Sequence, residues 1–485
     1  MSQTTVSRPL GQPGSLPREP VVTDAQYGPA ARSPDNTDSS AADAFRGETL
    51  AADLLSRVFG RFPGSIWVQL WTGPAFRVGA PTAISTAAGE DAPRFIIVFR
   101  NPQAVCATVL GRDPLRLAEL YFRGDLEIEG DFFSALGIRD DLEAIRTSAG
   151  DRLGAMFSAL RLYAMNAGWA RPPAGAPVHG HPVTAHSRSE NRAAIQFHYD
   201  VSNEFYALWL DRAMVYSCAY FERPDVTLDD AQKAKLEHIC RKLLLKPGER
   251  LLDIGCGWGA LAIYAAQRYE VRVHGITLSE QQFAVARQRV KEAGLEDRVT
   301  IDLVDYRDVA GEGVYDKVAS VGMFEHVGLK NLPIYFSTVN RLLKPAGLFL
   351  NHGITHEQQG SRPALRSEFI NRYVFPDGQL DSISSIQRVM EASHFEIADV
   401  EALRPHYALT LRHWVQRLER RYARALEYVN EATYRVWRLY MAACALEFES
   451  GAIGVYQVLA SKRAAINSEL PLTRRHLYSE PPIAV

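Results

Sequence analysis

The feature that most constrains the fold of this chain is a short apolar run that ends in alternating glycines. It reads LLDIGCGWG at residues 251–259 and is followed by an apolar-periodic segment, residues 260–268. The pattern predicts a buried strand, a tight turn and the start of a helix. Glycine lets the backbone turn sharply and approach a ligand closely, and the helix beyond the turn offers unpaired N–H groups. The stretch therefore predicts either a site for a nucleotide-like ligand or a tight strand-to-helix connection without a ligand.

The spacing of the glycines indicates which nucleotide-like ligand such a turn fits. The dinucleotide fingerprint requires G-x-G-x-x-G, whereas this turn reads G-x-G-x-G, and Ala260 stands where the fingerprint has its third glycine. The difference favours S-adenosylmethionine over NAD.

Strands alternate with helices on both sides of the glycine turn. Thr227 caps a helix before the turn, and Ser279 caps a later one with Gln282 at the capping-box position. The predicted strands are Leu251–Ile254, Val271–Thr277, Val299–Val304, Val314–Val321 and Gly347–Asn351. This alternation predicts a parallel, doubly wound α/β sheet, in which ligands bind at the carboxyl ends of the strands.

Glycines or polar side chains follow each of the five predicted strands. In strand order they are Gly255–Gly259, Thr277–Gln282, Asp305–Arg307, Glu325 with His326, and His352. One such residue is usually an ordinary surface or core group, but the carboxyl ends of parallel strands meet at one edge of the sheet. The sequence therefore predicts one site assembled from all five strand ends.

The rest of the chain divides by composition. Residues 1–45 are rich in Pro, Ser, Gly, Thr and Asp, which predicts a disordered tail. Residues 46–150 predict a small α+β domain, residues 151–190 a helix and linker, and residues 191–485 the domain with the glycine turn. Within the small domain, the pattern predicts strands at Ile66–Trp71 and Phe95–Phe99 and helices near 50–59 and 115–122. Two roles fit this domain equally well: a packing module or a lipid-handling module.

Overall composition excludes several classes of protein. The 485 residues are 47 % apolar and carry a formal net charge of −2 without a long basic block, which argues against a general nucleic-acid binder. The five cysteines are scattered with no C-x-x-C pair, which predicts a reducing, cytoplasmic setting and no thiolate metal site. His179, His181 and His186 fall in the linker without matching carboxylates, so we expect no metal there. We find neither a signal pattern nor an apolar run long enough to span a bilayer.

A basic, amphipathic helical segment is predicted at Leu409–Tyr440. Its arginines are Arg412, Arg417, Arg420, Arg421, Arg424, Arg435 and Arg438. Such a segment can lie on anionic headgroups or can be an ordinary solvated face, and the sequence does not separate the two.

From about Asn191 to the C-terminus, the chain resembles the cyclopropane-fatty-acyl-phospholipid synthase family of S-adenosylmethionine-dependent methyltransferases. The motifs are FHYD at 197–200, YSCAY at 216–220, LDIGCGWG at 252–259, VGMFEHVG at 321–328 and YVFPDG at 373–378. The segment 124–133 is similar, more loosely, to the N-terminal domain of that family. The resemblance implies a class I methyltransferase-like doubly wound sheet, with the smaller α+β domain and the disordered tail before it.

The same resemblance implies a reaction. The methyl group of S-adenosylmethionine is delivered to a cis double bond of a phospholipid acyl chain, a proton is lost from that methyl, and a cyclopropane ring closes. An alkene is a poor nucleophile, so the reactants must be held close in a dry pocket. The methylated cation is acidic enough for a weak, positioned anionic base to suffice. The family uses a bound bicarbonate, whose ligands correspond here to Cys218, Glu325, His352, Ile354 and Tyr407.

Chemically, that set of residues suits an anion. The imidazole and the phenol can donate to the ion, Glu325 can accept from its hydroxyl or orient His352, and Cys218 and Ile354 can contribute backbone N–H groups. The residues that correspond to the family's cofactor site are Tyr216, Ser217, Asp253, Gly255, Cys256, Gly257, Gly259, Thr277, Ser279, Gln281, Gln282, Tyr306 and Arg307. No acidic residue stands at the end of the second strand for the ribose hydroxyls, and Gln281 or Gln282 takes that role in this interpretation.

Two other functions remain open from the sequence alone. A related enzyme can let the same cation rearrange, which gives a methyl-branched or methylene-bearing acyl chain. A protein of another class, a lipid-binding protein without catalysis, is a further alternative. We expect a cytoplasmic protein that associates peripherally with the inner face of the membrane, acts on unsaturated phospholipid and binds no nucleic acid. A homodimer is one option for its oligomeric state, which the sequence leaves open.

Overall fold

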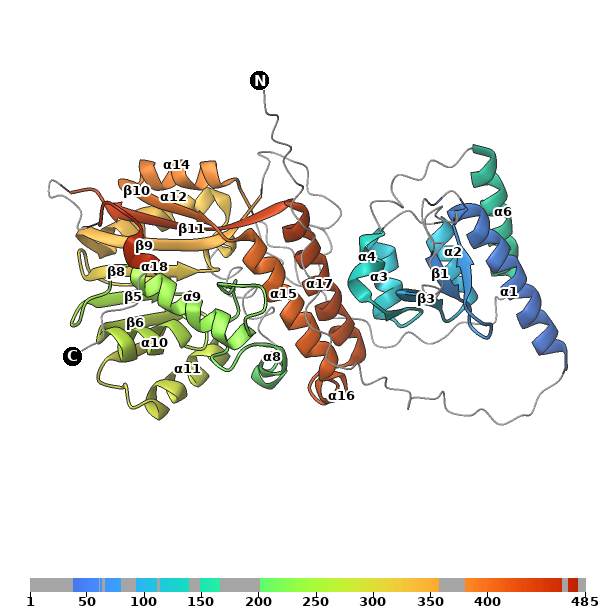
Figure 1. Cartoon of the computed structure of the whole chain (residues 1–485), viewed down its shortest axis with the longest axis horizontal. Helices are drawn as coiled ribbons and strands as arrows, with labels where there is room; N and C mark the ends of the chain where they lie inside the picture. The colour runs from blue at the N-terminus through green and yellow to red at the C-terminus, as the bar shows by residue number, and fades with distance from the viewer. Residues whose placement is uncertain are drawn as a thin grey trace, which may run out of the picture.

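The computed structural model describes residues 38–60, 62, 66–79, 93–110, 114–138, 149–165, 201–356, 380–464 and 470–478. These residues form two sheets, each with its own helices, at the two ends of an elongated molecule (Figure 1). Several predictions fall outside the described residues: the tail as far as residue 37, the linker, and the motifs at 197–200 and 373–378.

The larger sheet has seven strands in the order β10-β11-β9-β8-β5-β6-β7. The five predicted strands are confirmed as the parallel strands β5 (Arg250–Ile254), β6 (Arg272–Thr277), β7 (Val299–Leu303), β8 (Tyr315–Val321) and β9 (Leu343–His356). Strands β10 (Phe395–Ala402) and β11 (Ile453–Lys462) were not predicted from the sequence. Because β11 runs antiparallel to both of its neighbours, the sheet is mixed rather than wholly parallel.

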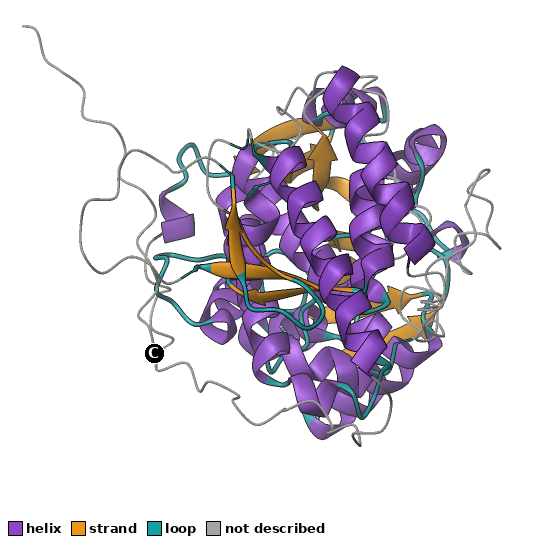
Figure 2. Cartoon of the chain, turned by 90° about the vertical axis from the view of Figure 1, so that its right-hand side faces the viewer, coloured by secondary structure: helices purple, strands orange, loops and turns teal. Residues whose placement is uncertain are grey.

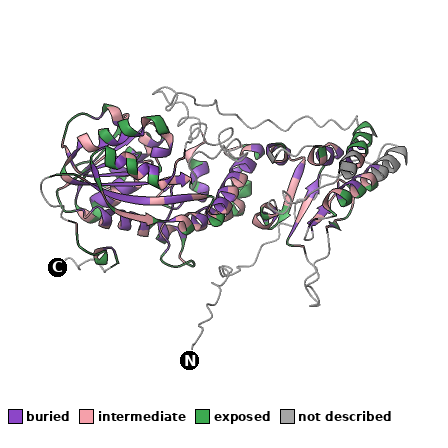
Figure 3. Ribbon diagram, turned by 90° about the horizontal axis from the view of Figure 1, so that it is seen from above, coloured by how far each residue is buried: buried purple, intermediate pink, exposed green. Residues whose placement is uncertain are grey.

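Helices cover both faces of this sheet, as a doubly wound fold requires. Leu251 of β5 packs into one buried cluster with α9 (Leu228–Lys242), α10 (Ala260–Tyr269) and α11 (Glu280–Glu292). The next residue, Leu252, packs into a second cluster with α12 (Leu332–Leu342) and α14 (Ile383–Ala392). Successive side chains of a strand point to opposite faces, so burial on both sides makes the strand read as one apolar run. The strands of this sheet are accordingly mostly buried (Figure 3).

Both predicted helix caps are confirmed. The side chain of Thr227 accepts from the backbone N–H of Asp230 at the start of α9. The side chain of Ser279 accepts from the N–H of Gln282 at the start of α11. Each cap satisfies one of the otherwise unpaired N–H groups of its helix, which fixes where the helix begins relative to the strand before it.

The smaller sheet has the order β2-β1-β3-β4 and lies in the N-terminal domain. Its strands and helices are α1 (Asp38–Phe59), β1 (Ile66–Gln69), β2 (Phe76–Val78), β3 (Phe95–Phe99), α2 (Pro102–Leu110), α3 (Pro114–Phe122), β4 (Leu126–Gly130), α4 (Phe132–Gly137) and α6 (Ala149–Met165). Viewed from this end, helices lie in front of the strands (Figure 2). The predicted α+β domain is therefore present.

A helix crosses each predicted end of this domain. Helix α1 begins at Asp38, inside the segment predicted to be a tail, where several alanines favour a helix. Helix α6 packs against α1 and α2, and the thiol of Cys106 donates to the carbonyl of Ala159 over 3.3 Å. Helix α6 thus lies largely in the segment predicted as a helix and linker, residues 151–190, and packs against the helices of the small domain.

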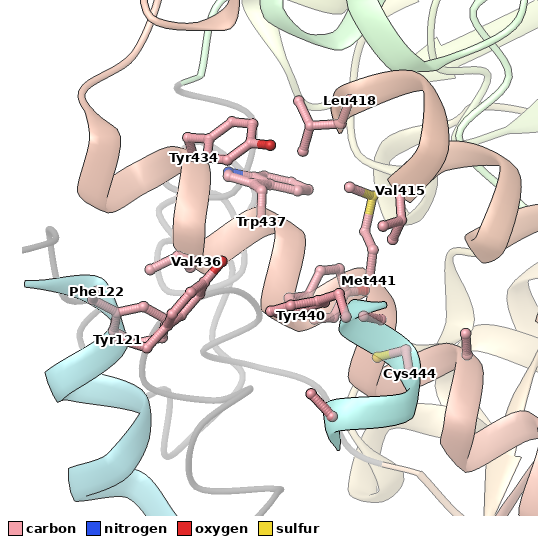
Figure 4. Packing of buried hydrophobic residues seen from close by; sticks show 14 of the residues in the cluster. Tyr121, Phe122, Val415, Leu418, Tyr434, Val436, Trp437, Tyr440, Met441 and Cys444 are labelled. Carbon is pink, nitrogen blue, oxygen red and sulfur yellow. The ribbon is translucent and has the colours of Figure 1, made fainter. Parts of the chain in front are cut away.

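The predicted basic helix is broken into α15 (Arg404–Arg420), α16 (Tyr422–Ala425) and α17 (Glu431–Ser450). Helix α17 lies between the two domains, where Tyr121 and Phe122 approach Val436 and Tyr440 (Figure 4). These residues belong to one buried cluster that draws on both domains. The two domains therefore share a hydrophobic core.

Five of the seven arginines of this segment form contacts within the molecule, which bears on the two alternatives that the sequence leaves open, a headgroup-binding face and a solvated face. Arg435 donates to the Tyr121 carbonyl over 3.0 Å and pairs with Glu127, and the Arg438 guanidinium lies 3.9 Å from the centre of the Phe132 ring. Further internal partners are Glu449 for Arg412, Asp229 for Arg417, and the Leu208 carbonyl for Arg421. Arginine pairs well with carboxylates and aromatic rings, so these five arginines contribute to packing within the molecule, whereas Arg420 and Arg424 are exposed. In the described part of the chain, no helix has the length and apolarity to cross a bilayer.

Candidate active site

A cavity opens at the carboxyl ends of β5, β6, β7 and β8, at the edge of the sheet that the sequence predicts. Its empty space is about 1160 Å³ when the open mouth is included. Ten of the thirteen predicted cofactor residues line it, namely Tyr216, Ser217, Asp253, Gly255, Cys256, Gly257, Thr277, Gln282, Tyr306 and Arg307.

The glycine turn gives this cavity its floor. Gly255 and Gly257 have φ values of +77° and +54°, which residues with a side chain rarely adopt. A Cβ at Gly255 would lie 3.1 Å from Cγ of Met323, whereas a Cβ at Gly257 would meet no atom within 4 Å. Since Gly257 lines the cavity, that open space is available to a ligand. The turn therefore forms a cradle that a side chain would fill, which is what a closely held cofactor requires.

The remaining three predicted cofactor residues do not line the cavity. Gly259, with φ of +82°, is the residue before α10, and Ser279 caps α11. Gln281 is exposed, whereas Gln282 is buried, lines the cavity and accepts from the hydroxyl of Thr277 over 2.9 Å. Of the two glutamines that the sequence leaves open for the ribose, the structure brings only Gln282 into the site.

At the end of β7, Asp305 and Arg307 hold each other in place. The guanidinium of Arg307 donates to both carboxylate oxygens of Asp305, over 2.8 and 2.6 Å. This bidentate pair fixes the η1 turn (Tyr306–Asp308), on which Tyr306 is also buried.

Two buried ionisable groups lie in the cavity wall. Asp253 is 2 % exposed, and its Oδ2 has no hydrogen-bond partner among the described residues. Burial raises the pKa of Asp253 to about 7, and the positive charge of Lys235 opposes that rise. Burial lowers the pKa of Lys235 to about 8, and its ammonium donates to the Ser217 hydroxyl over 2.9 Å. An unpaired buried oxygen in the cavity wall is an acceptor available to ligand hydroxyl or amino groups.

Lys235 is a site residue that was not predicted from the sequence. The structure buries three polar residues of α9, where apolar side chains are the norm: Gln232, Lys235 and Lys242. In the sequence, the hint of this was that these polar residues occur among the apolar positions of the helix. A lysine at such a position requires a polar partner inside the protein.

Substituting Asp253 by asparagine tests the burial of this carboxyl. The pKa of Asp253 in the folded protein lies above the value of 3.8 for a free side chain. Ionisation of Asp253 therefore lowers the free energy of unfolding. The loss is complete above pH 7 and shrinks as the pH falls towards 4. We expect the ligand-free Asp253→Asn protein to melt at a higher temperature than wild type at pH 8, with a smaller gap at pH 5. Thermal unfolding at both pH values measures this, with exposed Asp297→Asn as the control. An equal gap at both pH values would contradict the buried, proton-binding Asp253.

The five residues predicted to bind an anion are linked through a second cluster of hydrogen bonds that runs by way of Val455 and Leu403. The carboxylate of Glu325, in the η2 turn (Phe324–His326), accepts from the backbone N–H of Ile354 over 2.7 Å. Ile354 pairs across the sheet with Val455, whose carbonyl accepts from the N–H of Leu403 over 2.8 Å. The Leu403 carbonyl accepts in turn from the N–H of Tyr407 over 3.2 Å and from the thiol of Cys218 over 3.8 Å.

His352 joins this cluster from within β9, two residues before Ile354. The prediction that His352 follows its strand was wrong, because β9 continues to His356. The Ile354 N–H, which was predicted to face the ion, is already bound by Glu325. None of the five residues lines the cofactor cavity, so the second cluster is a separate part of the site.

Burial keeps two ionisable groups of the second cluster, His352 and Cys218, neutral. His352 is 2 % exposed, and its Nε2 has no hydrogen-bond partner among the described residues. Burial, with the positive charges of Lys235 and Lys242 next in importance, lowers the pKa of His352 well below its ordinary value. Burial likewise raises the pKa of the Cys218 thiol, so that this sulfur stays protonated. The second cluster thus combines a neutral imidazole and a neutral thiol with the Glu325 carboxylate, and the buried Nε2 of His352 is the described atom that could meet a small anion such as bicarbonate.

Comparisons with known proteins show which family this chain is similar to. Residues 186–458 match the family described as mycolic acid cyclopropane synthetase. A probable fatty acid methyltransferase of Pseudomonas putida is 42 % identical over 85 % of this chain and 95 % of its own length. The cyclopropane-fatty-acyl-phospholipid synthase of Escherichia coli is 42 % identical over 57 % of this chain and 70 % of its own length.

Solved structures give the same result for the larger domain. The cyclopropane synthase MmaA2 from Mycobacterium tuberculosis is 34 % identical, with a TM-score of 0.54 over 56 % of this chain and 98 % of that one. The mycolic acid cyclopropane synthase CmaA1, complexed with SAH and CTAB, is 37 % identical, with a TM-score of 0.53 over the same shares. The chain therefore belongs to the cyclopropane-fatty-acyl-phospholipid synthase family of S-adenosylmethionine-dependent methyltransferases.

Proposed function

We propose that this protein transfers the methyl group of S-adenosylmethionine to a double-bond carbon of an unsaturated acyl chain in a phospholipid. The observation that best supports this is the glycine cradle at the strand ends, in a chain whose relative along nearly its whole length is a probable fatty acid methyltransferase. S-adenosylmethionine supplies an electrophilic methyl group on a sulfonium.

In this proposal the first part of the site binds the methyl donor. The cradle at Gly255 and Gly257 lets the backbone approach the ligand closely, and Asp253 accepts from its polar groups. Gln282 and Thr277 meet the ribose hydroxyls in place of the acidic residue usual at the end of the second strand. The remaining binding residues are Tyr216, Ser217, Cys256, Tyr306 and Arg307, while Gly259 and Ser279 set the starts of the helices behind them.

The second part manages the proton. Methyl transfer leaves a carbocation on the acyl chain, and this cation must lose a proton for the product to form. We assign bicarbonate to the second cluster as the acceptor of that proton. His352 and Tyr407 would donate to such an ion, and Glu325, which holds β9 through the Ile354 N–H, would accept from its hydroxyl. Cys218 packs beside them as a neutral thiol. Burial keeps this cluster away from bulk water, which would otherwise trap the cation.

Two kinds of product can follow from the same cation. A hydride shift moves the cation to the carbon that carries the new methyl group. Loss of a proton from that methyl group then gives a methylene-bearing chain, and loss from a neighbouring chain carbon gives a methyl-branched alkene. The fatty acid methyltransferase relatives in Pseudomonas putida and Mycobacterium tuberculosis favour this outcome. Direct loss of a proton from the added methyl group gives a cyclopropane ring. The convergence of Cys218, Glu325, His352, Ile354 and Tyr407 favours the ring as the second candidate.

The products formed from lipid distinguish these outcomes. The purified protein is incubated with vesicles of cis-unsaturated phospholipid and methyl-labelled S-adenosylmethionine, and the acyl chains are identified by mass spectrometry. A methyl or methylene branch that carries the label supports the first candidate, and a labelled ring supports the second. No transfer to lipid, with intact binding of S-adenosylmethionine, would overturn both and leave a lipid-binding protein without catalysis.

The phospholipid is reached at a membrane surface in this proposal, and the cytoplasmic face is where S-adenosylmethionine is available. We therefore expect part of the protein to sediment with phospholipid vesicles on centrifugation. Substituting Arg417 or Arg421 should leave that fraction unchanged, because Arg417 contacts Leu210 and Asp229 and Arg421 contacts Leu208 within the molecule.

A further inference from the structure

Gln457 is a buried polar residue that contacts the second cluster and that neither the motifs nor the proposed reaction uses. It lies in the middle of β11, directly opposite His352 on β9. Gln457 is fully buried, and its amide Nε2 lies 3.2 Å from Nδ1 of His352. A buried amide side chain at hydrogen-bond distance from an imidazole nitrogen constrains that ring.

The contact decides where the proton of the ring resides. With the Gln457 amide oriented as in the structure, its Nε2 donates and Nδ1 of His352 accepts the hydrogen bond. A neutral imidazole carries its single proton on the other nitrogen, which here is Nε2. Neutrality agrees with the lowered pKa that burial and two nearby lysines cause at His352. The ring therefore presents an Nε2–H that no described residue accepts.

We propose that Gln457 is a positioning residue that holds His352 as the Nε2–H tautomer, so that His352 donates a hydrogen bond to the anion and cannot itself take up the proton. The inference rests on the proposed role of the second cluster. In this tautomer both ring nitrogens of His352 are hydrogen-bonded: Nδ1 accepts from Gln457 and Nε2–H donates to the ion. The acceptor of the proton has to be the anion held by the cluster.

On the side away from His352, Gln457 neighbours strand β10. Glu401 on β10 pairs with Gln457 in register, and its carboxylate is engaged by Lys242 over 2.6 Å and by His238 over 2.7 Å. Because the Glu401 carboxylate already has these two partners, the charged groups beside Gln457 are balanced without His352. A neutral imidazole is thus the state that this surrounding favours.

The tautomer can be measured directly on the full-length protein without substrate. Two-bond ¹H–¹⁵N correlation spectra of protein labelled at its histidine rings separate the Nε2–H from the Nδ1–H form, and the His352→Asn variant assigns the His352 signals. We expect the Nε2–H pattern in wild type. In Gln457→Glu above pH 8, a carboxylate that accepts from the ring should convert His352 to the Nδ1–H form. Exposed Gln288→Glu on α11 is the matched control and should leave the spectrum unchanged.

Activity and binding complete the test. We expect Gln457→Glu to lower the rate of methyl transfer about 100-fold, the scale for a misdirected catalytic donor, with unchanged affinity for S-adenosylmethionine. If that variant does not fold, Gln457→Leu serves as the test. Leucine removes the hydrogen bond to Nδ1 of His352, so we expect the Nδ1 signal to shift in this variant.

Two results would overturn the inference: an Nδ1–H pattern in wild type, or an unchanged His352 signal in the folded Gln457 variants. Failure of the proposed function gives a different result, because a protein that methylates no lipid would still show the Nε2–H pattern and its response to Gln457.

Discussion

Replacing Glu325 by glutamine is expected to lower the rate of methyl transfer to lipid by at least about 100-fold, the scale for a lost charged group at a proton-transfer site. Glutamine keeps the shape and an acceptor oxygen for the Ile354 N–H, so the hydrogen bond of 2.7 Å that supports β9 can persist. What disappears is a negative charge that is 7 % exposed. The expected loss is therefore in the chemical step rather than in the fold.

Two measurements separate these causes. The affinity for S-adenosylmethionine, determined by calorimetry, should equal that of wild type because Glu325 does not line the cofactor cavity. The melting temperature should also change little. Glu391→Gln on α14 makes the same chemical change at an exposed position and should retain full activity. A Glu325→Gln protein with wild-type turnover would exclude Glu325 from the proton-handling cluster.

Replacing Gly257 by valine is expected to weaken binding of S-adenosylmethionine by about 100-fold or more, because the new side chain occupies space that the ligand requires. The position has φ of +54° and lines the cavity, and a Cβ attached there would have no atom within 4 Å. Valine at a positive φ also strains the backbone and lowers stability. Binding is measured by calorimetry and stability by thermal unfolding.

Gly294→Val is the matched control for this substitution. Gly294 has a similar φ of +65° and also has no atom within 4 Å of a Cβ, but it lies after α11 and does not line the cavity. Both variants should lose comparable stability, and only Gly257→Val should lose affinity. Equal affinity in the two variants would show that the cavity at the glycine turn is not where the methyl donor binds.

The parallel half of the larger sheet could be predicted because its strands are short apolar runs separated by recognisable caps. Strand β9 was predicted too short, since Lys344-Pro345-Ala346-Gly347 reads as a break although the strand continues through it. Strand β11 was missed because Gly454 and Gln457 interrupt its apolar run, which leaves neither a continuous apolar stretch nor a regular alternation.

The residues of the site also fall into those that the sequence predicts and those that it does not. Residues at the ends of parallel strands follow from local pattern, and ten of the predicted cofactor residues line the cavity. Lys235 and Gln457 were missed because each becomes part of the site through the packing of a distant element, α9 over the sheet and β11 beside β9. The internal contacts of the arginines of α15 and α17 could not be predicted for a related reason. Charge pattern identifies a basic face but not the carboxylates and rings that come to meet it, such as Glu127 and Phe132.

The position of β11 between β9 and β10 also bears on how the protein comes into being. The cofactor cavity is lined by residues 214–327, whereas the second cluster needs Leu403 and the strand at 453–462. Translation proceeds from the N-terminus, so every element that lines the methyl-donor cavity is made well before the strand that orients His352. A chain interrupted before residue 453 has the residues of the donor site but lacks the hydrogen bond from Gln457 to its histidine. The contact between Gln457 and His352 can therefore form only after synthesis has passed β11, later than every residue that lines the cavity.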